Sequence, residues 1–232
     1  KINAADAEHA EKFKLKIDKL RKTIDALSHS FAHSDLKILL NTIENMHVIE
    51  HLPGYQRDII QVVEQRDCEP LYVGFRAQDE FIKRMNDFDW FLFLEDDIII
   101  NDSCFLDKVD LFNTRCGLNN AILLPHRYEL LNQHKIYIDR DFTRESTFMW
   151  DSLSVINIQD RKFAEFQNPH AGMYCLTKEQ LKLWSDAGRQ WYNKHTYVGP
   201  LESAATGCLF ECFRIYKPYI SNMHFLEVQH MD

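Results

Sequence analysis

Residues 90–100 of this chain are Trp90-Phe91-Leu92-Phe93-Leu94-Glu95-Asp96-Asp97-Ile98-Ile99-Ile100. Five apolar residues without alternation predict a strand that is buried on both faces, as in the middle of a parallel sheet. Three carboxylates at the end of such a strand are costly to bury unless a positive group lies beside them. Open α/β sheets bind ligands at the carboxyl ends of their strands, and a divalent metal carrying a phosphorylated ligand is a suitable partner. We therefore expect a site at Glu95, Asp96 and Asp97.

The composition bounds the class of protein. The chain has 232 residues, of which 45% are hydrophobic and 27% charged, so we expect one domain that covers residues 1–232. A net charge of −8 disfavours a general nucleic-acid binder. The seven glycines form neither a GxGxxG nor a P-loop motif, which argues against a classical dinucleotide or Walker-type site.

The sequence also bears on the compartment. No apolar run is long enough to cross a bilayer, so we expect no membrane span in this chain. The six cysteines include no CxxC pair, and reduced thiols are favoured over disulfides. We therefore expect a cytoplasmic protein, with the Golgi lumen as the alternative if an anchor lies upstream.

Hydrophobic periodicity and turn residues place the expected elements. A helix is predicted from about Ala7 to Ser30, and residues 56–65 are compatible with either a helix or a strand. Further helices are expected at 77–86 and 105–111, and strands at 37–41, 121–124, 172–176 and 214–218. An edge hairpin could pair 135–138 with 154–156. Thr177 and Gln180 have the spacing of a capping box at a helix start, and Pro200 suits the first turn of another helix.

An apolar strand followed by Glu95-Asp96-Asp97 resembles the DxD-type motif of GT-A fold glycosyltransferases, which transfer a sugar from a nucleotide-sugar donor. In that family the motif holds Mn²⁺ or Mg²⁺ against the donor diphosphate. The resemblance implies that Asp97 is the direct metal ligand, and that Glu95 and Asp96 contact the ribose side or complete the metal shell. It also implies a single α/β GT-A-like (Rossmann-like) domain, with a mixed, mostly parallel central sheet flanked by helices. Glu in place of Asp at the first position departs from the strict motif.

Three further segments carry the resemblance. Gly74-Phe75-Arg76-Ala77 is similar to the segment that precedes the motif in that family, which implies that Arg76 lies near the nucleotide. The stretch from His170 to Leu181 is similar to a strand–helix turn that lines the acceptor and donor sugars in Golgi-type galactosyltransferase relatives. There Gly172 would allow close approach of the backbone to a ligand, and His170 could form a hydrogen bond with a sugar.

The region from Val198 to Ala204 resembles the place where inverting enzymes of the family carry an acidic general base, which implies that role for Glu202. A late histidine, His230 or His224, would add a metal ligand. Plain structural alternatives stay open: a solvated Arg76, a loop residue at His170, an acid that suits a first helical turn at Glu202, and a surface histidine near the terminus. The resemblance covers about Leu71 to Asp232.

These features together predict a metal-dependent glycosyltransferase of the hexosyltransferase type. It would use Mn²⁺ or Mg²⁺ and transfer a sugar from a nucleotide-diphosphate sugar, expected to be a UDP-sugar, to a glycan or other hydroxyl acceptor with inversion. Two alternatives are a sugar nucleotidyltransferase and a non-catalytic nucleotide- or carbohydrate-binding module.

Overall fold

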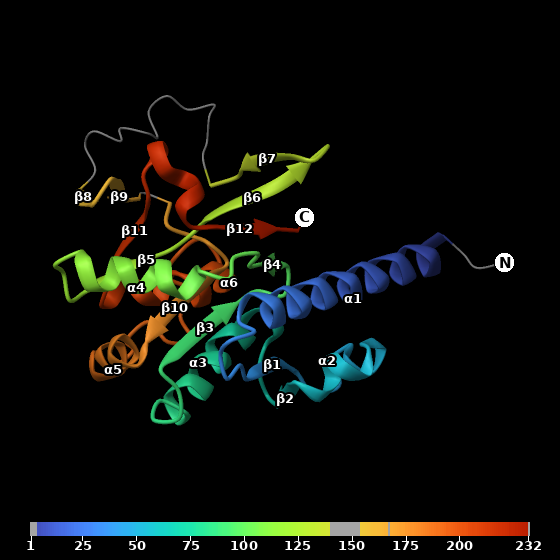
Figure 1. The fold of residues 1–232 in the computed structure, drawn as a ribbon. Coiled ribbons are helices and arrows are strands. Elements are labelled where there is room, and N and C mark those ends of the chain that lie inside the picture. The colour runs from blue at the N-terminus through green and yellow to red at the C-terminus, as the bar shows by residue number, and fades with distance from the viewer. Residues whose placement is uncertain (1–3, 140–153, 167, 232) are drawn as a thin grey trace.

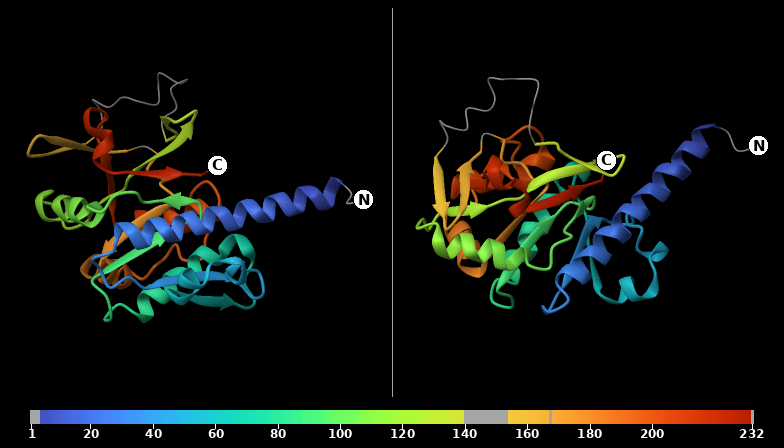
Figure 2. Two further views of the ribbon diagram at one scale, coloured as in Figure 1. Left: turned by 45° about the vertical axis from the view of Figure 1, so that its right-hand side comes forward. Right: turned by 45° about the horizontal axis from the view of Figure 1, so that its top comes forward.

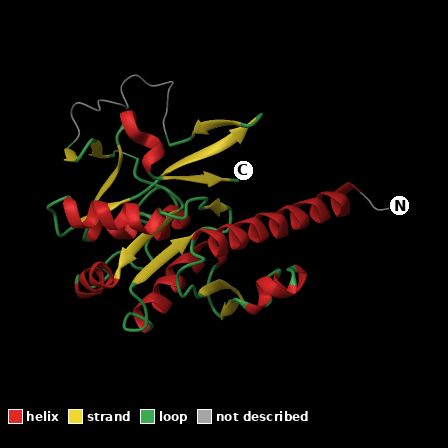
Figure 3. Cartoon of the chain, viewed as in Figure 1, coloured by secondary structure: helices red, strands yellow, loops and turns green. Residues whose placement is uncertain are grey.

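The structure is a computed structural model that describes residues 4–139, 154–166 and 168–231 (Figure 1). Its α-helices are α1 (Ala4–Ser30), α2 (Gly54–Asp58), α3 (Val73–Lys83), α4 (Phe105–Arg115), α5 (Lys178–Asp186) and α6 (Pro200–Ala205). Its 3-10 helices are η1 (Ile49–His51), η2 (Pro70–Tyr72), η5 (Gly207–Glu211) and η6 (Ile220–Phe225). The strands are β1 (Ile38–Ile43), β2 (Ile60–Gln65), β3 (Trp90–Leu94), β4 (Ile98–Ile99), β5 (Ala121–Leu123), β6 (His126–Leu131), β7 (His134–Tyr137), β8 (Val155–Ile158), β9 (Arg161–Glu165), β10 (Met173–Thr177), β11 (Arg214–Pro218) and β12 (Glu227–His230). Helices and strands are interspersed throughout the molecule (Figure 3).

The strands do not form the mostly parallel central sheet that the sequence predicts. In the described residues they make four small sheets, with the orders β1-β2, β10-β3, β5-β11-β9-β8 and β4-β12-β6-β7. Three pairings are parallel (β1-β2, β11-β5 and β12-β6), and the other described pairings are antiparallel. The predicted fold class, a GT-A-like (Rossmann-like) domain with one mostly parallel sheet, is therefore wrong; the fold is mixed α/β. An apolar run reports burial, but it does not specify the direction of the strand that pairs with it.

The strand that precedes the three acids is β3, and its only described partner is the antiparallel strand β10. Phe91 and Phe93 are buried, whereas the alternate residues of β3 are half-buried. Such alternation is typical of a strand with one face more deeply covered than the other. Tyr174 lies opposite Phe93 in the register, and their rings stack with centroids 5.1 Å apart. These contacts join β3 and β10 in the main hydrophobic core.

Helix α1 packs on the body of the molecule mainly through its C-terminal half, although the Phe13 ring also packs edge-on against His51. Its N-terminal half extends beyond the rest of the chain (Figure 2). In the packed half, Leu20 and Ile24 are buried in a small second core. Thr23 Oγ1 donates a hydrogen bond of 3.0 Å to the carbonyl of Asp96, and Ser30 Oγ donates one of 2.7 Å to the carbonyl of Ile100. The helix therefore holds the residues just after β3 at two points.

Several local predictions are confirmed. The helix predicted from Ala7 to Ser30 is α1, and the capping box of Thr177 and Gln180 starts α5 with both of its hydrogen bonds present. Residues 56–65, which were open between helix and strand, contain the end of α2 and then β2. No helix in the described part of the chain is long and apolar enough to cross a membrane.

The predicted edge hairpin is wrong in its pairing. Strand β7 pairs with β6, and β8 pairs with β9, so residues 135–138 and 154–156 belong to two different hairpins in two different sheets. Both β7 and β8 pair with a strand that is nearer in sequence than the predicted partner, because closing a short loop costs less entropy than closing a long one.

Candidate functional site

The three acids Glu95, Asp96 and Asp97, the acidic turn, connect β3 to β4. The Glu95 amide donates to the carbonyl of Gly172, just before β10, over 2.9 Å. The Met231 amide, just after β12, donates to the carbonyl of Asp97 over 2.9 Å. Backbone hydrogen bonds therefore fix the acidic turn between segments that come from much later in the chain. The position after β3 agrees with the expectation that the acids emerge at a strand end.

Gly172 and Glu95 are in close contact. Gly172 has a φ of +63°, and a Cβ atom added to it would lie 2.7 Å from Oε2 of Glu95 and 3.1 Å from Cδ1 of Ile98. Both the left-handed backbone and the lack of space make a larger residue costly here. The Gly172 backbone therefore closely approaches the Glu95 side chain, and its approach to a ligand stays a prediction.

Asp97 and His230, both predicted as metal ligands, lie side by side. Oδ2 of Asp97 is 3.7 Å from Nε2 of His230 and 3.9 Å from Nζ of Lys19. Nδ1 of His230 is 2.9 Å from a carboxylate oxygen of Glu129. A carboxylate accepts hydrogen bonds, so Nδ1 carries the proton in the neutral ring and Nε2 presents its lone pair toward Asp97. Two acceptors that face each other in this way suit a cation placed between them.

Asp97 also has an unsatisfied atom. Its Oδ1 is buried and has no hydrogen-bond partner among the described residues. A buried carboxylate oxygen without a partner carries a large desolvation cost, which a bound cation would remove. The residues present thus fit a divalent metal in the chemistry of their donor atoms.

The protein supplies few metal ligands, however. Within the described residues no group of three His, Cys, Asp and Glu side chains is arranged to hold a metal ion. Asp96 is exposed, and its recorded hydrogen bond is made by its backbone carbonyl to Thr23. Mg²⁺ and similar ions are often held by only one or two carboxylates, and substrate phosphates and water complete the shell. The small number of protein ligands is therefore compatible with a metal ion that binds together with a diphosphate.

The negative charge of Glu202 acts on Glu95. Burial raises the pKa of Glu95 to about 7, the negative charge of Asp97 adds to the rise, Arg127 opposes it, and Glu202 raises it further. Glu202 lies in the first turn of α6, where Pro200 occupies the predicted position. The loop before it is strained, because Val198 has a φ of +51°, which β-branched residues rarely adopt. Glu202 is thus close enough to the acidic turn to influence its protonation.

His170 is held in the interior. It is buried, its Nδ1 lies 3.0 Å from Oγ1 of Thr206, and its carbonyl accepts a hydrogen bond of 2.8 Å from Nζ of Lys217. Burial lowers the pKa of His170 to about 3, and the positive charges of Arg127 and Lys217 lower it further. A neutral, buried imidazole that already has a partner is poorly placed to bind a sugar. The predicted contact between His170 and a sugar stays untested.

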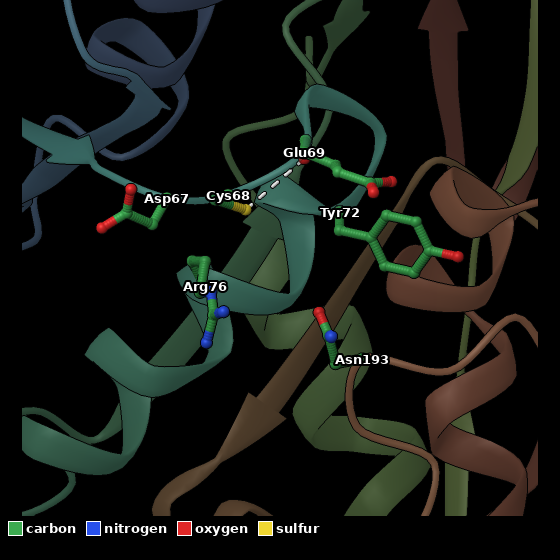
Figure 4. A pocket seen from close by; sticks show the side chains of 6 residues that line it. All are labelled: Asp67, Cys68, Glu69, Tyr72, Arg76 and Asn193. Atoms are coloured by element: carbon green, nitrogen blue, oxygen red, sulfur yellow. Dashed lines mark hydrogen bonds between the residues drawn. The ribbon is translucent and has the colours of Figure 1, made fainter.

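Arg76, the predicted nucleotide contact, lines a separate pocket of about 290 Å³ (Figure 4). Its Nη1 donates to the hydroxyl of Tyr192 over 2.8 Å and lies 3.9 Å from Oδ2 of Asp79. The pocket is lined by Asp67, Cys68, Glu69, Tyr72, Arg76 and Asn193. Within the described residues no ion pair or hydrogen bond links Arg76 to the acidic turn. The pocket is nevertheless adjacent to the element that carries Glu202, because η2 packs against α6.

Sequence reasoning missed three charged residues next to the acidic turn, namely Arg127, Asp139 and Lys217, the charge cluster. Lys217 lies in β11 and is fully buried, and Asp139 is almost fully buried. The one signal in the sequence was a lysine inside a predicted strand, at 214–218. Nothing local indicates that residues 78 positions apart form an ion pair.

The comparisons with known proteins give no family. No protein-family model, no curated protein and no solved structure matches the chain.

Proposed function

We propose that this protein is a metal-dependent glycosyltransferase of the hexosyltransferase type. It would transfer a sugar from a nucleotide-diphosphate sugar, a UDP-sugar in this proposal, to the hydroxyl of a glycan or other acceptor. The observation that carries the proposal is the pairing of Asp97 with His230 at the end of β3. There Asp97 has one unpartnered buried oxygen, Oδ1, while its other oxygen, Oδ2, faces the imidazole Nε2 of His230, and the Asp97 charge acts on Glu95.

Asp97 and His230 would hold the metal, Mn²⁺ or Mg²⁺, with Glu95 or the exposed Asp96 completing the shell on the side of the donor. A bound divalent ion neutralises the negative charge that develops on a departing diphosphate. Glu129 orients His230 through its hydrogen bond to Nδ1, as carboxylates do behind metal-binding histidines. Lys19 offers a second positive charge at the same carboxylate.

Glu202 is the proposed general base. An acceptor hydroxyl is a weak nucleophile until a carboxylate takes its proton as the new bond forms. Glu202 stands on a different element from the metal-binding residues, yet its charge acts on Glu95. With the base and the metal on opposite sides of the sugar, a single displacement would invert the anomeric centre. If Glu202→Gln leaves transfer intact, another group is the base.

The pocket around Arg76 is the proposed place for the nucleoside. It combines an aromatic ring at Tyr72, a cation at Arg76 and hydrogen-bonding groups at Asp67 and Asn193, which suit a base and a ribose. It lies against α6, so that a diphosphate could run from the pocket toward the acidic turn. All six cysteines lie in the described residues and are free thiols, which supports a reducing compartment and hence the cytoplasm in this proposal.

The decisive experiment is product analysis with a panel of UDP- and GDP-sugars in the presence and absence of Mn²⁺. A glycosyltransferase releases nucleoside diphosphate, a nucleotidyltransferase releases pyrophosphate, and a binding module releases neither. Asp97→Asn is expected to abolish metal-dependent release. The matched control is Asp186→Asn on α5, which should leave activity unchanged. Asp186 is an exposed aspartate whose ion pair among the described residues is with Lys182. Release of pyrophosphate, or no release with any donor, would refute the proposal.

A further inference from the structure

The charge cluster is a costly arrangement. Nζ of Lys217 donates to Oδ2 of Asp139 over 2.8 Å, and both side chains have no exposed surface. Burial alone would raise the pKa of Asp139, but the positive charges of Lys217 and Arg127 hold that pKa below its usual value. Burial lowers the pKa of Lys217, and Asp139 opposes that change. Buried ion pairs of this kind are often no more stable than apolar side chains of the same volume. Stability alone therefore gives no reason for this one.

Arg127 is the member of the cluster that reaches the surface. Its backbone amide donates to Oδ2 of Asp139 over 3.0 Å, its Nε donates to Oδ1 over 2.9 Å, and its Nη2 lies 2.9 Å from Oδ1. The side chain is 14% exposed. Its Nη1 has no partner among the described residues, and Nη1 is not among the buried unsatisfied atoms. The guanidinium is thus fixed along the edge formed by Nε and Nη2, while its other edge, at Nη1, has no partner in the described part of the chain.

The cluster that holds Arg127 is connected to the candidate site through the backbone at His170 and Gly172. Lys217 Nζ also donates to the carbonyl of His170, and two residues later the carbonyl of Gly172 accepts from the Glu95 amide. The cluster is therefore attached to the same short segment that fixes the acidic turn. The charge of Arg127 acts on Glu95, on His170 and on Tyr197, and the charge of Glu202 acts on Glu95 and Tyr197. Arg127 thus lies among the carboxylates of the proposed reaction.

We propose that Arg127 is a further catalytic residue, whose free guanidinium edge binds an anionic oxygen of the substrate, and that Asp139 and Lys217 are its positioning residues. This inference rests on the proposed glycosyl transfer. The anionic oxygen belongs either to the donor diphosphate or to an acid group on the acceptor, because an arginine recognises phosphate and carboxylate with the same donors. Asp139 and Lys217 together keep the cluster at one net positive charge, so the guanidinium remains available to an anion.

The test uses the full chain with Arg127→Met and Arg127→Lys, and with Arg115→Met as control. Arg115 is an exposed arginine in the last turn of α4, a helix that supplies no residue of the proposed site. Loss of one charge-assisted contact should lower kcat/KM about 10- to 100-fold in Arg127→Met. Arg127→Lys should recover part of the loss, and Arg115→Met should behave as the wild type. Calorimetry with UDP and Mn²⁺ distinguishes the sources: weaker UDP binding indicates the diphosphate, whereas unchanged UDP binding with a raised acceptor KM indicates an acidic acceptor.

The positioning role has its own variant. Asp139→Asn combined with Lys217→Met removes one buried charge of each sign, so the fold should be retained with a midpoint within a few degrees of the wild type. We expect this double variant to raise the same KM as Arg127→Met, by about 10-fold, because a neutral amide holds the guanidinium less firmly. Wild-type kinetics in the double variant would overturn the positioning role. Wild-type kinetics and UDP binding in Arg127→Met would overturn the inference, while the metal-dependent release of nucleoside diphosphate would still stand.

Discussion

Gly172→Ala tests the contact on which the geometry of the acidic turn depends. An alanine there must adopt a φ of +63°, which costs an L-residue about 1–2 kcal/mol. Its Cβ would also lie 2.7 Å from Oε2 of Glu95. Relief of that clash requires Glu95 or the backbone to move, and overpacking of this kind costs about 1–3 kcal/mol. We therefore expect the variant to lose about 3 kcal/mol of unfolding free energy, or roughly 6–12 °C in Tm for a chain of this size.

The control for this experiment is Gly117→Ala. Gly117 has a φ of +72°, but no atom lies within 4 Å of the position that its Cβ would occupy. The loss of unfolding free energy in this variant therefore comes from the left-handed backbone alone. Urea unfolding of both variants separates the two costs, and the difference between them is the cost of displacing Glu95. Turnover should fall at least about tenfold in Gly172→Ala and remain unchanged in Gly117→Ala, since a small misplacement at a reacting centre is costly. Equal unfolding midpoints for the two variants would show that Glu95 does not approach Gly172.

Substitutions at three more positions test the acidic turn and the start of α5. Glu95 has a pKa of about 7 in the folded chain against 4.5 as the reference, so the folded state holds an extra proton and unfolding free energy falls as pH rises through this window. Glu95→Gln should remove that pH dependence and stabilise the protein at pH 8 by at most about 3 kcal/mol. If the urea midpoints measured over a pH series are the same in the variant and the wild type, the pKa of Glu95 is not raised. Thr177→Ala deletes the capping box of α5 and should cost about 1 kcal/mol, whereas Thr177→Ser should cost little; equal loss in both would exclude the cap as the cause. Thr23→Val removes the hydrogen bond from α1 to the Asp96 carbonyl and should weaken Mn²⁺ binding about tenfold in calorimetry, with unaltered affinity as the contrary result.

The local structure around the site was predictable because its signals lie close together in the sequence. The 3.6-residue spacing of Leu20, Ile24 and Leu27 marks α1, and all three are buried. The side chains of Thr177 and Gln180 each accept a hydrogen bond from the backbone amide of the other residue, only three positions away. This short range is why the predicted start of α5 is correct. The acidic turn and the glycine at 172 were also found, since a charge after an apolar strand and an isolated glycine are conspicuous in themselves.

The pairing of strands was not predictable in the same way. Five apolar residues in β3 have the same appearance whether their partner runs parallel or antiparallel, and the antiparallel partner β10 comes about 80 positions later. The same holds for the predicted edge hairpin: β7 pairs with β6, and β8 pairs with β9. In each case the register depends on side chains that meet only after the chain has folded.

By itself the sequence determined the long first helix, the capping box and the three carboxylates of the acidic turn, because propensity, capping and patterning act between residues within a few positions of one another. Only the tertiary structure decided which charges meet these carboxylates. Coulomb interactions and desolvation depend on distance and burial in space. The contact of His230 with Asp97 therefore forms only in the folded chain. The same holds for the ion pairs of Asp139 with Arg127 and Lys217, which form when β6 and β11 are brought together.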